Sequence, residues 1–250
     1  METLVTKSRF AVFVTCMAFC FACASTLHAT TYTVSGEYWR SADSTLNDSS
    51  NQYVPVAGSA VYSTTPDAIF TVTGSDSTQL INFNSGSGST NYYVGDFLNY
   101  GSGMGSGYTI TWNTGAAHAA DGLDDSLFQF QGTTTLADDT MYTFSHDDGF
   151  IFYLNGNIVV NDGGPSAPTA TAFCVGDTSF CSGQAYSTTS GTYSFTLDYA
   201  EVDGPGAVLY TDLPLTGPVP TSVTPEPSSL LMLGSGLAAA AAMLRRRLFN

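Results

Sequence analysis

The chain has 250 residues, with 21 acidic and 6 basic side chains, a length that accommodates one large domain or two small ones. The bases lie almost entirely at the two ends: Arg40 is the one base between residues 30 and 224, where 19 of the acids lie. Nucleic-acid binding needs lysine and arginine to displace counterions, so this class is excluded, as are P-loop nucleotide binders and proteins that bind anionic membrane surfaces. Such an acidic body suits cations or neutral sugars as partners.

Residues 1–29 have the pattern of a secretion signal peptide. Lys7 and Arg9 form a positive region, residues 10–24 are apolar, and two candidate cleavage sites end at Ala24 and Ala29. The pattern predicts a signal helix and export of the chain. An N-terminal anchor that is not cleaved is the alternative.

Residues 30–213 are predicted to form one all-β domain, an antiparallel β-sandwich. Alternation of apolar and polar residues predicts strands at 69–73, 80–83, 108–112, 128–131, 142–145, 192–199 and 207–210. No convincing amphipathic helix is found in the body, apart from one turn at 116–120. The Gly/Ser-rich segments 84–90 and 101–107 are expected to be surface loops rather than linkers.

The run at residues 150–154 is apolar on both faces, so we expect it to lie centrally in a sheet. Asn155 and Gly156 follow directly, and a second apolar run begins at Asn157. Asn-Gly between two such runs predicts a β-hairpin with a type I′ turn, because both turn residues must adopt positive φ.

The densest chemistry of the chain lies just before this run, at Asp147, Asp148 and Gly149. Neighbouring carboxylates repel each other unless a cation or hydrogen bonds offset the repulsion, and their oxygens suit a hard cation such as calcium. The alternative is a solvated acidic turn, because Asp and Gly are ordinary turn residues. His146 is interpreted as a turn residue, since calcium prefers oxygen ligands.

A set of short motifs resembles the protective-antigen-type β-sandwich domain found in fungal flocculins and bacterial glycosidases. The motifs are residues 128–132, the Tyr-x-Phe strand 142–144, the Asp-Asp-Gly turn 147–149 and Asn-Gly at 155–156, and the resemblance spans residues 32–213. In lectin members the paired aspartates, joined by a cis peptide bond, bind calcium, which bridges to sugar hydroxyls.

The resemblance therefore implies that Asp147 and Asp148 bind calcium and the ligand. The family also uses an asparagine from a later loop, which has no counterpart here; Asp203 is the nearest replacement as a metal ligand. Trp39 and Trp112 are interpreted as core residues, with stacking on a sugar as the alternative.

Cys174 and Cys181 are the cysteines that remain after removal of the signal. An even pair in an exported protein predicts a disulfide. Because the closed loop is short, the chain-entropy model gives it only about 2.5 kcal/mol. A metal site would need further ligands, and no second Cys or His pair lies nearby.

Residues 214–224 are rich in Pro and Thr and are predicted to be an extended stalk. The final segment, 225–250, has three parts: Pro225-Glu226-Pro227, an uncharged run at 230–244, and the cluster Arg245-Arg246-Arg247. As a helix this run spans about 22 Å, less than the roughly 30 Å of a bilayer core. It is thus a weak anchor whose arginines stay in the cytoplasm.

These three parts, in this order, resemble the PEP-CTERM sorting signal of Gram-negative bacteria that make exopolysaccharide. In that family the exosortase, an integral-membrane transpeptidase, recognises and cleaves the tail. The resemblance implies that the hydrophobic helix lies in the membrane only transiently. It also implies export through the inner membrane to the cell envelope, cell surface or extracellular matrix.

The favoured function is a surface or matrix protein that binds a glycan or exopolysaccharide through calcium, without catalysis. A purely structural matrix or biofilm protein is the alternative, and Asp162-Gly163-Gly164, similar to fibro-slime variants of the module, favours a matrix role. A carboxylate-pair glycosidase is the third hypothesis. Enzyme function is not expected, because there is no Gly-x-Ser-x-Gly motif and no separate catalytic domain fits in the chain.

Overall fold

The computed structural model describes residues 31–40, 53–85, 93–103, 108–164, 166–176, 186–202 and 206–216. All of them fall within one compact unit that begins at Thr31. The predicted signal peptide and sorting segment lie outside the described residues, as do their predicted helices. Within the part of the chain that the structure describes, no helix is long and apolar enough to span a bilayer.

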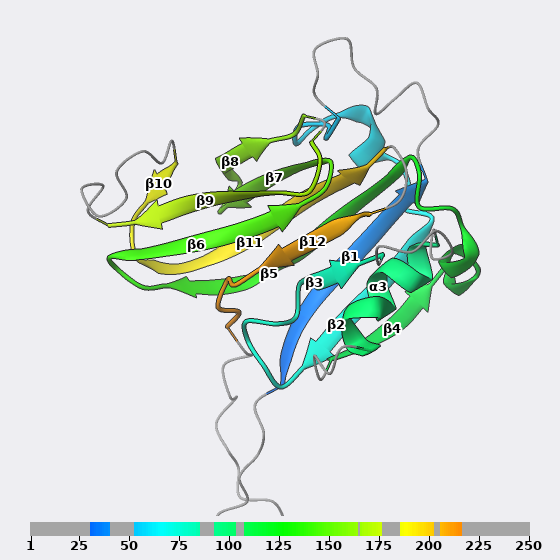
Figure 1. The fold of residues 1–250 in the computed structure, drawn as a ribbon, viewed down its shortest axis with the longest axis horizontal. Helices are drawn as coiled ribbons and strands as arrows, with labels where there is room; N and C mark the ends of the chain where they lie inside the picture. The colour runs from blue at the N-terminus through cyan, green and yellow to red at the C-terminus, as the bar shows by residue number, and fades with distance from the viewer. Residues whose placement is uncertain are drawn as a thin grey trace, which may run out of the picture. The chain divides into compact units, whose positions relative to one another are not determined.

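The described residues form two β-sheets that pack face to face, as the sequence predicts (Figure 1). The strands are β1 (Tyr32–Arg40), β2 (Ala68–Gly74), β3 (Asn82–Asn84), β4 (Tyr108–Thr114), β5 (Ser126–Leu136), β6 (Thr140–His146), β7 (Gly149–Leu154), β8 (Asn157–Asp162), β9 (Thr169–Val175), β10 (Ser187–Thr188), β11 (Gly191–Glu201) and β12 (Val208–Thr211). The helical elements are the 3-10 turns η1 (Ala60–Ser63) and η2 (Ala116–Ala120) and the α-helix α3 (Val94–Gly103).

One sheet has seven strands in the order β4-β2-β1-β5-β11-β7-β8, and the other has five in the order β10-β9-β6-β12-β3. All pairs are antiparallel except β9 with β10. The predicted strands are confirmed within a few residues of their ends, while β1, β9 and β10 were not predicted. β7 lies inside the seven-stranded sheet and all six of its residues are buried, in agreement with its apolar sequence.

The inner faces of the two sheets enclose an aromatic core. Phe128 and Phe130 of β5 stack with centroids 6.2 Å apart, and Phe130 stacks on Phe83 of β3 at 5.1 Å, which joins the two sheets. Phe97 of α3 stacks on Tyr199 of β11 at 5.6 Å. Burial of one such side chain contributes about 1.5–3 kcal/mol, so this layer is the main source of stability.

The helix α3 is the clearest departure from the sequence-based prediction. Val94, Phe97 and Leu98 are buried, so the helix contributes one apolar stripe to the core. Only these three positions show the apolar spacing of an amphipathic helix. The helix then continues into Gly101 and Gly103, which lie in a segment expected to be a loop. Glycine disfavours a helix by about 1 kcal/mol, so packing overrides propensity here.

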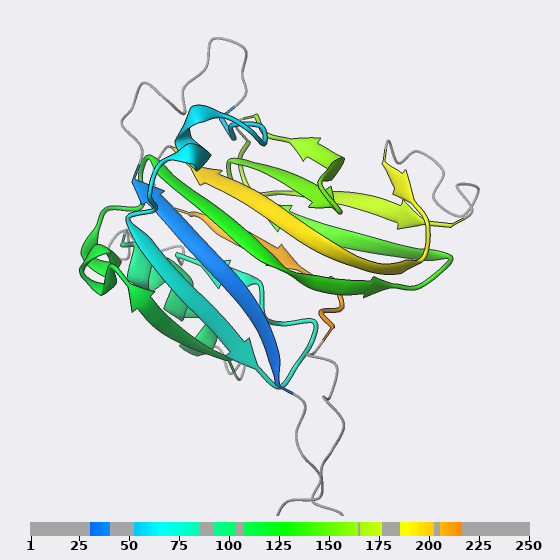
Figure 2. The same ribbon diagram turned by 180° about the vertical axis from the view of Figure 1, so that it is seen from behind.

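A second, smaller core lies on the outer face of the seven-stranded sheet, beneath residues 53–64, which we call the strap. Trp39, Leu127, Ile151 and Ala200 are buried there. The strap packs Tyr62 edge-on against Trp39 at 5.6 Å, and Figure 2 shows this cyan segment near the ends of the blue and yellow strands. Among the described residues, both cores are formed by side chains between positions 34 and 215.

The predicted hairpin between β7 and β8 is confirmed. Leu154 pairs with Asn157, and the two turn residues have φ of 47° at Asn155 and 78° at Gly156. Both values are positive, as a type I′ turn requires.

Candidate functional site

The Asp147-Asp148 pair occupies the turn between β6 and β7, where the chain crosses from the five-stranded to the seven-stranded sheet. The Asp147 N–H donates to the Val208 carbonyl (2.9 Å), and the Asp148 N–H donates to Asp147 Oδ1 (3.0 Å). Asp148 has φ of 38°, in the left-handed region that aspartate tolerates better than most residues. The described residues contain no cis peptide bond, so the cis bond implied by the lectin pattern is wrong for this pair.

Gly149 fixes the way in which the turn enters β7. A Cβ added to it would lie 2.6 Å from the carbonyl carbon and oxygen of Gly163, a backbone contact that cannot move aside. The residue therefore has to be glycine for a packing reason.

The His146 side chain is fully buried and forms a hydrogen bond with the turn. Its ring is buried against Phe150, with centroids 4.6 Å apart, and Nδ1 donates to the Asp148 carbonyl (2.8 Å). Nε2 lies 3.2 Å from Oδ2 of Asp162. These contacts use both ring nitrogens, and His146 is the buried last residue of β6 rather than a turn residue.

The two carboxylates face the segment between β11 and β12. Asp148 is 6% exposed, and its Oδ2 accepts the Val202 N–H (2.8 Å). A Cβ added to Gly206, which has φ of 127°, would lie 3.3 Å from Asp147 Oδ2. Val202, the residue before Asp203, therefore contacts the pair directly. Asp203 itself lies outside the described residues.

Burial raises the pKa of the Asp147 carboxyl, the hydrogen bond from the Asp148 N–H lowers it, and the negative charge of Asp148 raises it further. Repulsion between the two aspartates is thus only partly offset by the backbone.

Glu201, at the end of β11, is a third acid that sequence reasoning missed. It is 1% exposed, and the Tyr199 hydroxyl donates to its Oε2 (2.8 Å). Burial, with the charge of Asp148 as the next cause, raises its pKa to about 9, so the side chain is neutral at pH 7. The sequence pattern could have identified this acid, because extending the alternation of Leu197 and Tyr199 by one step places Glu201 on the inner face.

Asp198 is fully buried on the outer face, although the alternation of β11 predicts that it faces solvent. Oδ1 accepts from the Gln129 amide (2.8 Å), and Gln131 donates in turn to Gln129 (2.6 Å). The Tyr62 hydroxyl faces Asp198 but donates to the Pro55 carbonyl (3.1 Å), so Oδ2 has no hydrogen-bond partner among the described residues. Burial raises the pKa of Asp198 to about 6.

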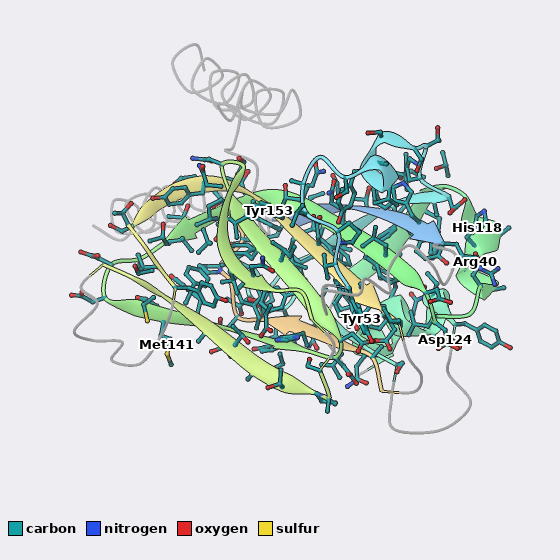
Figure 3. All side chains as sticks on the ribbon, turned by 90° about the horizontal axis from the view of Figure 1, so that it is seen from above. Arg40, Tyr53, His118, Asp124, Met141 and Tyr153 are labelled. Atoms are coloured by element: carbon teal, nitrogen blue, oxygen red, sulfur yellow. The ribbon has the colours of Figure 1, made fainter. Side chains whose placement is uncertain are left out.

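The two tryptophans and His118 make contacts within the fold. Trp39 is buried, and Trp112 packs on Phe70 at 5.6 Å. His118 Nδ1 lies 2.8 Å from Asp121, which also pairs with Arg40 at 3.8 Å, and Figure 3 shows His118 and Arg40 together. Asp121 therefore has two described partners, the His118 imidazole and the Arg40 guanidinium.

Among the described residues, no group of three or more His, Cys, Asp or Glu side chains is placed to hold a metal ion. Cys174 is buried on β9 and forms a disulfide, but Cys181 lies outside the described residues, so their pairing stays a prediction. The sorting residues Pro225, Glu226 and Pro227, with Arg245, Arg246 and Arg247, likewise lie outside them.

Comparison with known proteins identifies the C-terminal segment: residues 223–247 match the PEP-CTERM protein-sorting motif. The chain thus carries this sorting signal, as its sequence predicts. Curated proteins give no match to the chain.

Among solved structures, the body resembles PA14 domains. The PA14 sugar-binding domain of an RTX adhesin is 17% identical, with a TM-score of 0.44, covering 74% of this chain and 99% of that one. The PA14 domain of the antifreeze protein MpAFP is 18% identical, with a TM-score of 0.43, covering 77% and 86%.

We predict that Gly149→Ala destabilises the body by about 1–3 kcal/mol, because the new methyl group is forced against the Gly163 backbone. Gly122→Ala is the matched control, since nothing lies within 4 Å of a Cβ at that position. Urea denaturation monitored by circular dichroism measures both. Equal stability of the two variants would contradict the proposed backbone contact.

We predict that Asp198→Asn raises the free energy of unfolding at pH 8 and not at pH 4. Below pH 3.8 the carboxyl is protonated in both states, but as the pH rises through about 6 the folded chain must ionise a buried acid. The raised pKa thus corresponds to stability lost on going to neutral pH, roughly 2–3 kcal/mol. Urea denaturation at the two pH values tests this, with the exposed Asp96→Asn as control. A difference independent of pH would show that Asp198 does not titrate in this way.

Proposed function

We propose that the chain is an exported, exosortase-processed surface or matrix protein whose acidic turn binds a glycan through calcium, without catalysis. The sorting motif supports export, and it is consistent with a membrane contact through the C-terminal tail before processing. The observation that carries the binding site is the turn itself: two neighbouring aspartates are held by backbone hydrogen bonds in a chain that has almost no bases.

Calcium suits this donor set because carboxylate oxygens are hard ligands and the ion accepts six to eight of them in flexible geometry. Asp147 and Asp148 would supply the first oxygens. Asp203, which lies outside the described residues, is the sequence-based candidate for a further ligand, and the residue before it, Val202, bonds to Asp148. Sugar hydroxyls would complete the coordination, and the acidic body favours a neutral glycan such as an uncharged exopolysaccharide.

The burial of the neighbouring acids argues against a glycosidase. Hydrolysis by a carboxylate pair needs one neutral and one ionised acid on either side of the scissile bond. Glu201 is neutral and Asp148 lies near it, but their side chains are 1% and 6% exposed. A sugar cannot pass between acids that the protein itself covers.

A purely structural role is the second candidate, and one contact favours it. Asp148 Oδ2 accepts the Val202 N–H, while the Asp148 carbonyl accepts from both His146 and Ser166. These bonds tie β6, β7 and β11 together without any ligand, so the turn has a use in the fold alone.

We predict that calcium binds residues 30–224 at one saturable site and that Asp147→Asn weakens this binding roughly tenfold or more, because a carboxylate ligand becomes a neutral amide. Asparagine keeps the shape of the side chain and its acceptor oxygen for the Asp148 N–H, so the turn stays intact. Calorimetric titration measures the affinity of each protein.

Asp96→Asn removes an equal charge from an exposed position of α3 and is the control. If calcium gives no heat, or binds Asp147→Asn and wild type equally, the acidic turn is a structural feature and the matrix interpretation replaces the lectin one. If binding is lost selectively, a glycan array with and without a chelator then identifies the sugar.

A further inference from the structure

The two sheets end in four edge strands, and three of them are protected against pairing with another chain. Exposed edges are ready templates for strand addition, and natural proteins protect them with shortness, charge, proline or irregular register. β10 has two residues and β3 has three, with α3 packed beside β3. β8 has a register shift in its pairing with β7, and it ends at Asp162.

β4 is the fourth edge. Its pairing with β2 also has a register shift, between Ile69 and Phe70, and α3 contacts it too, but neither shortness, charge nor proline protects it. It is seven residues long, Tyr-Thr-Ile-Thr-Trp-Asn-Thr, with no charged residue and no proline. Among the described residues it pairs with β2 alone, and Figures 1 and 2 both show it at the border of the sheet. Thr109, Thr111 and Asn113 are exposed on its outer face.

The sequence of β4 is complementary to itself. When two copies run antiparallel about a two-fold axis through Ile110, Thr109 of each lies opposite Thr111 of the other, and Tyr108 lies opposite Trp112. Thr–Thr and aromatic pairs are among the favourable cross-strand pairs. We propose that β4 is a docking edge for a second copy of this chain, joining two seven-stranded sheets into one continuous sheet.

The charge of β4 is compatible with a second copy at this edge. The chain has a formal net charge of −15, so two copies repel each other over most of their surfaces. Pairing through β4 places only uncharged side chains opposite one another, whereas pairing through β8 would bring Asp162 into the contact. The contact is isologous, so it closes as a dimer and leaves no second β4 edge for further growth.

We predict that residues 30–224 form a dimer and that Thr111→Lys weakens it roughly tenfold or more, because the two lysines then lie diagonally across the two-fold axis, within range of mutual repulsion. Sedimentation equilibrium over a range of concentrations, in the presence of a chelator, measures the association. Thr73→Lys is the matched control: it lies on the same outer face of β2, directly opposite Thr109, but one strand away from the edge. Circular dichroism and thermal melting show whether each variant folds.

Mixing Thr111→Lys with Thr111→Asp supplies a second, independent measurement. Opposite charges across the axis are expected to restore a heterodimer, which a misfolded variant would not form. A wild-type chain that is monomeric throughout, a dimer insensitive to Thr111→Lys, or equal losses in Thr111→Lys and Thr73→Lys would each overturn the proposal. Because the chelator removes calcium, these outcomes leave the glycan-binding proposal untouched.

Discussion

The antiparallel ladder between β5 and β11 determines where the chemistry of this protein lies. Its pairs run from Ser126 with Glu201 to Leu136 with Gly191, in the middle of the larger sheet. Alternation along it sends Tyr199 and Glu201 into the core and Asp198 to the opposite face. A slip of one residue would exchange the two faces and bury the polar set in the aromatic core. The register that protects the core therefore also places one acid beside the acidic turn and another under the strap.

A chain with so few bases has to stabilise its buried acids by other means, and three are visible. Glu201 stays protonated and accepts a hydrogen bond from Tyr199. Asp198 Oδ1 accepts a hydrogen bond from the Gln129 amide, yet its Oδ2 has no hydrogen-bond partner among the described residues. Asp148 accepts a backbone N–H. Unsatisfied buried acids cost stability unless they are neutral or hydrogen-bonded. At the turn, Asp147 lies beside the buried Asp148, and the negative charge of Asp148 raises the pKa of Asp147.

Local patterns in the sequence predicted local structure well. The hairpin at Asn155 and Gly156, the alternating strands and the sorting motif all depend on neighbouring residues and were confirmed. Helix α3 was missed because its apolar residues are few and its end is glycine-rich, so tertiary packing decides its conformation. Asp198 was placed in solvent because alternation cannot show that a distant segment, the strap, covers that face. Glu201 was within reach of the same alternation, but its raised pKa depends on Asp148, which is adjacent only in the fold.

The proposed dimer through β4 would strengthen the proposed binding of a glycan at the acidic turn. In the proposed site the protein would supply few of the calcium ligands, so a single site would bind a sugar weakly. A two-fold dimer through β4 presents two such sites at a fixed separation, and a polymer with repeating sugars can occupy both. The second binding step is then intramolecular, and avidity can exceed the affinity of one site by about 10²–10⁴ without any new contact. An uncharged edge would thus let an acidic, mutually repelling protein crosslink a matrix polymer.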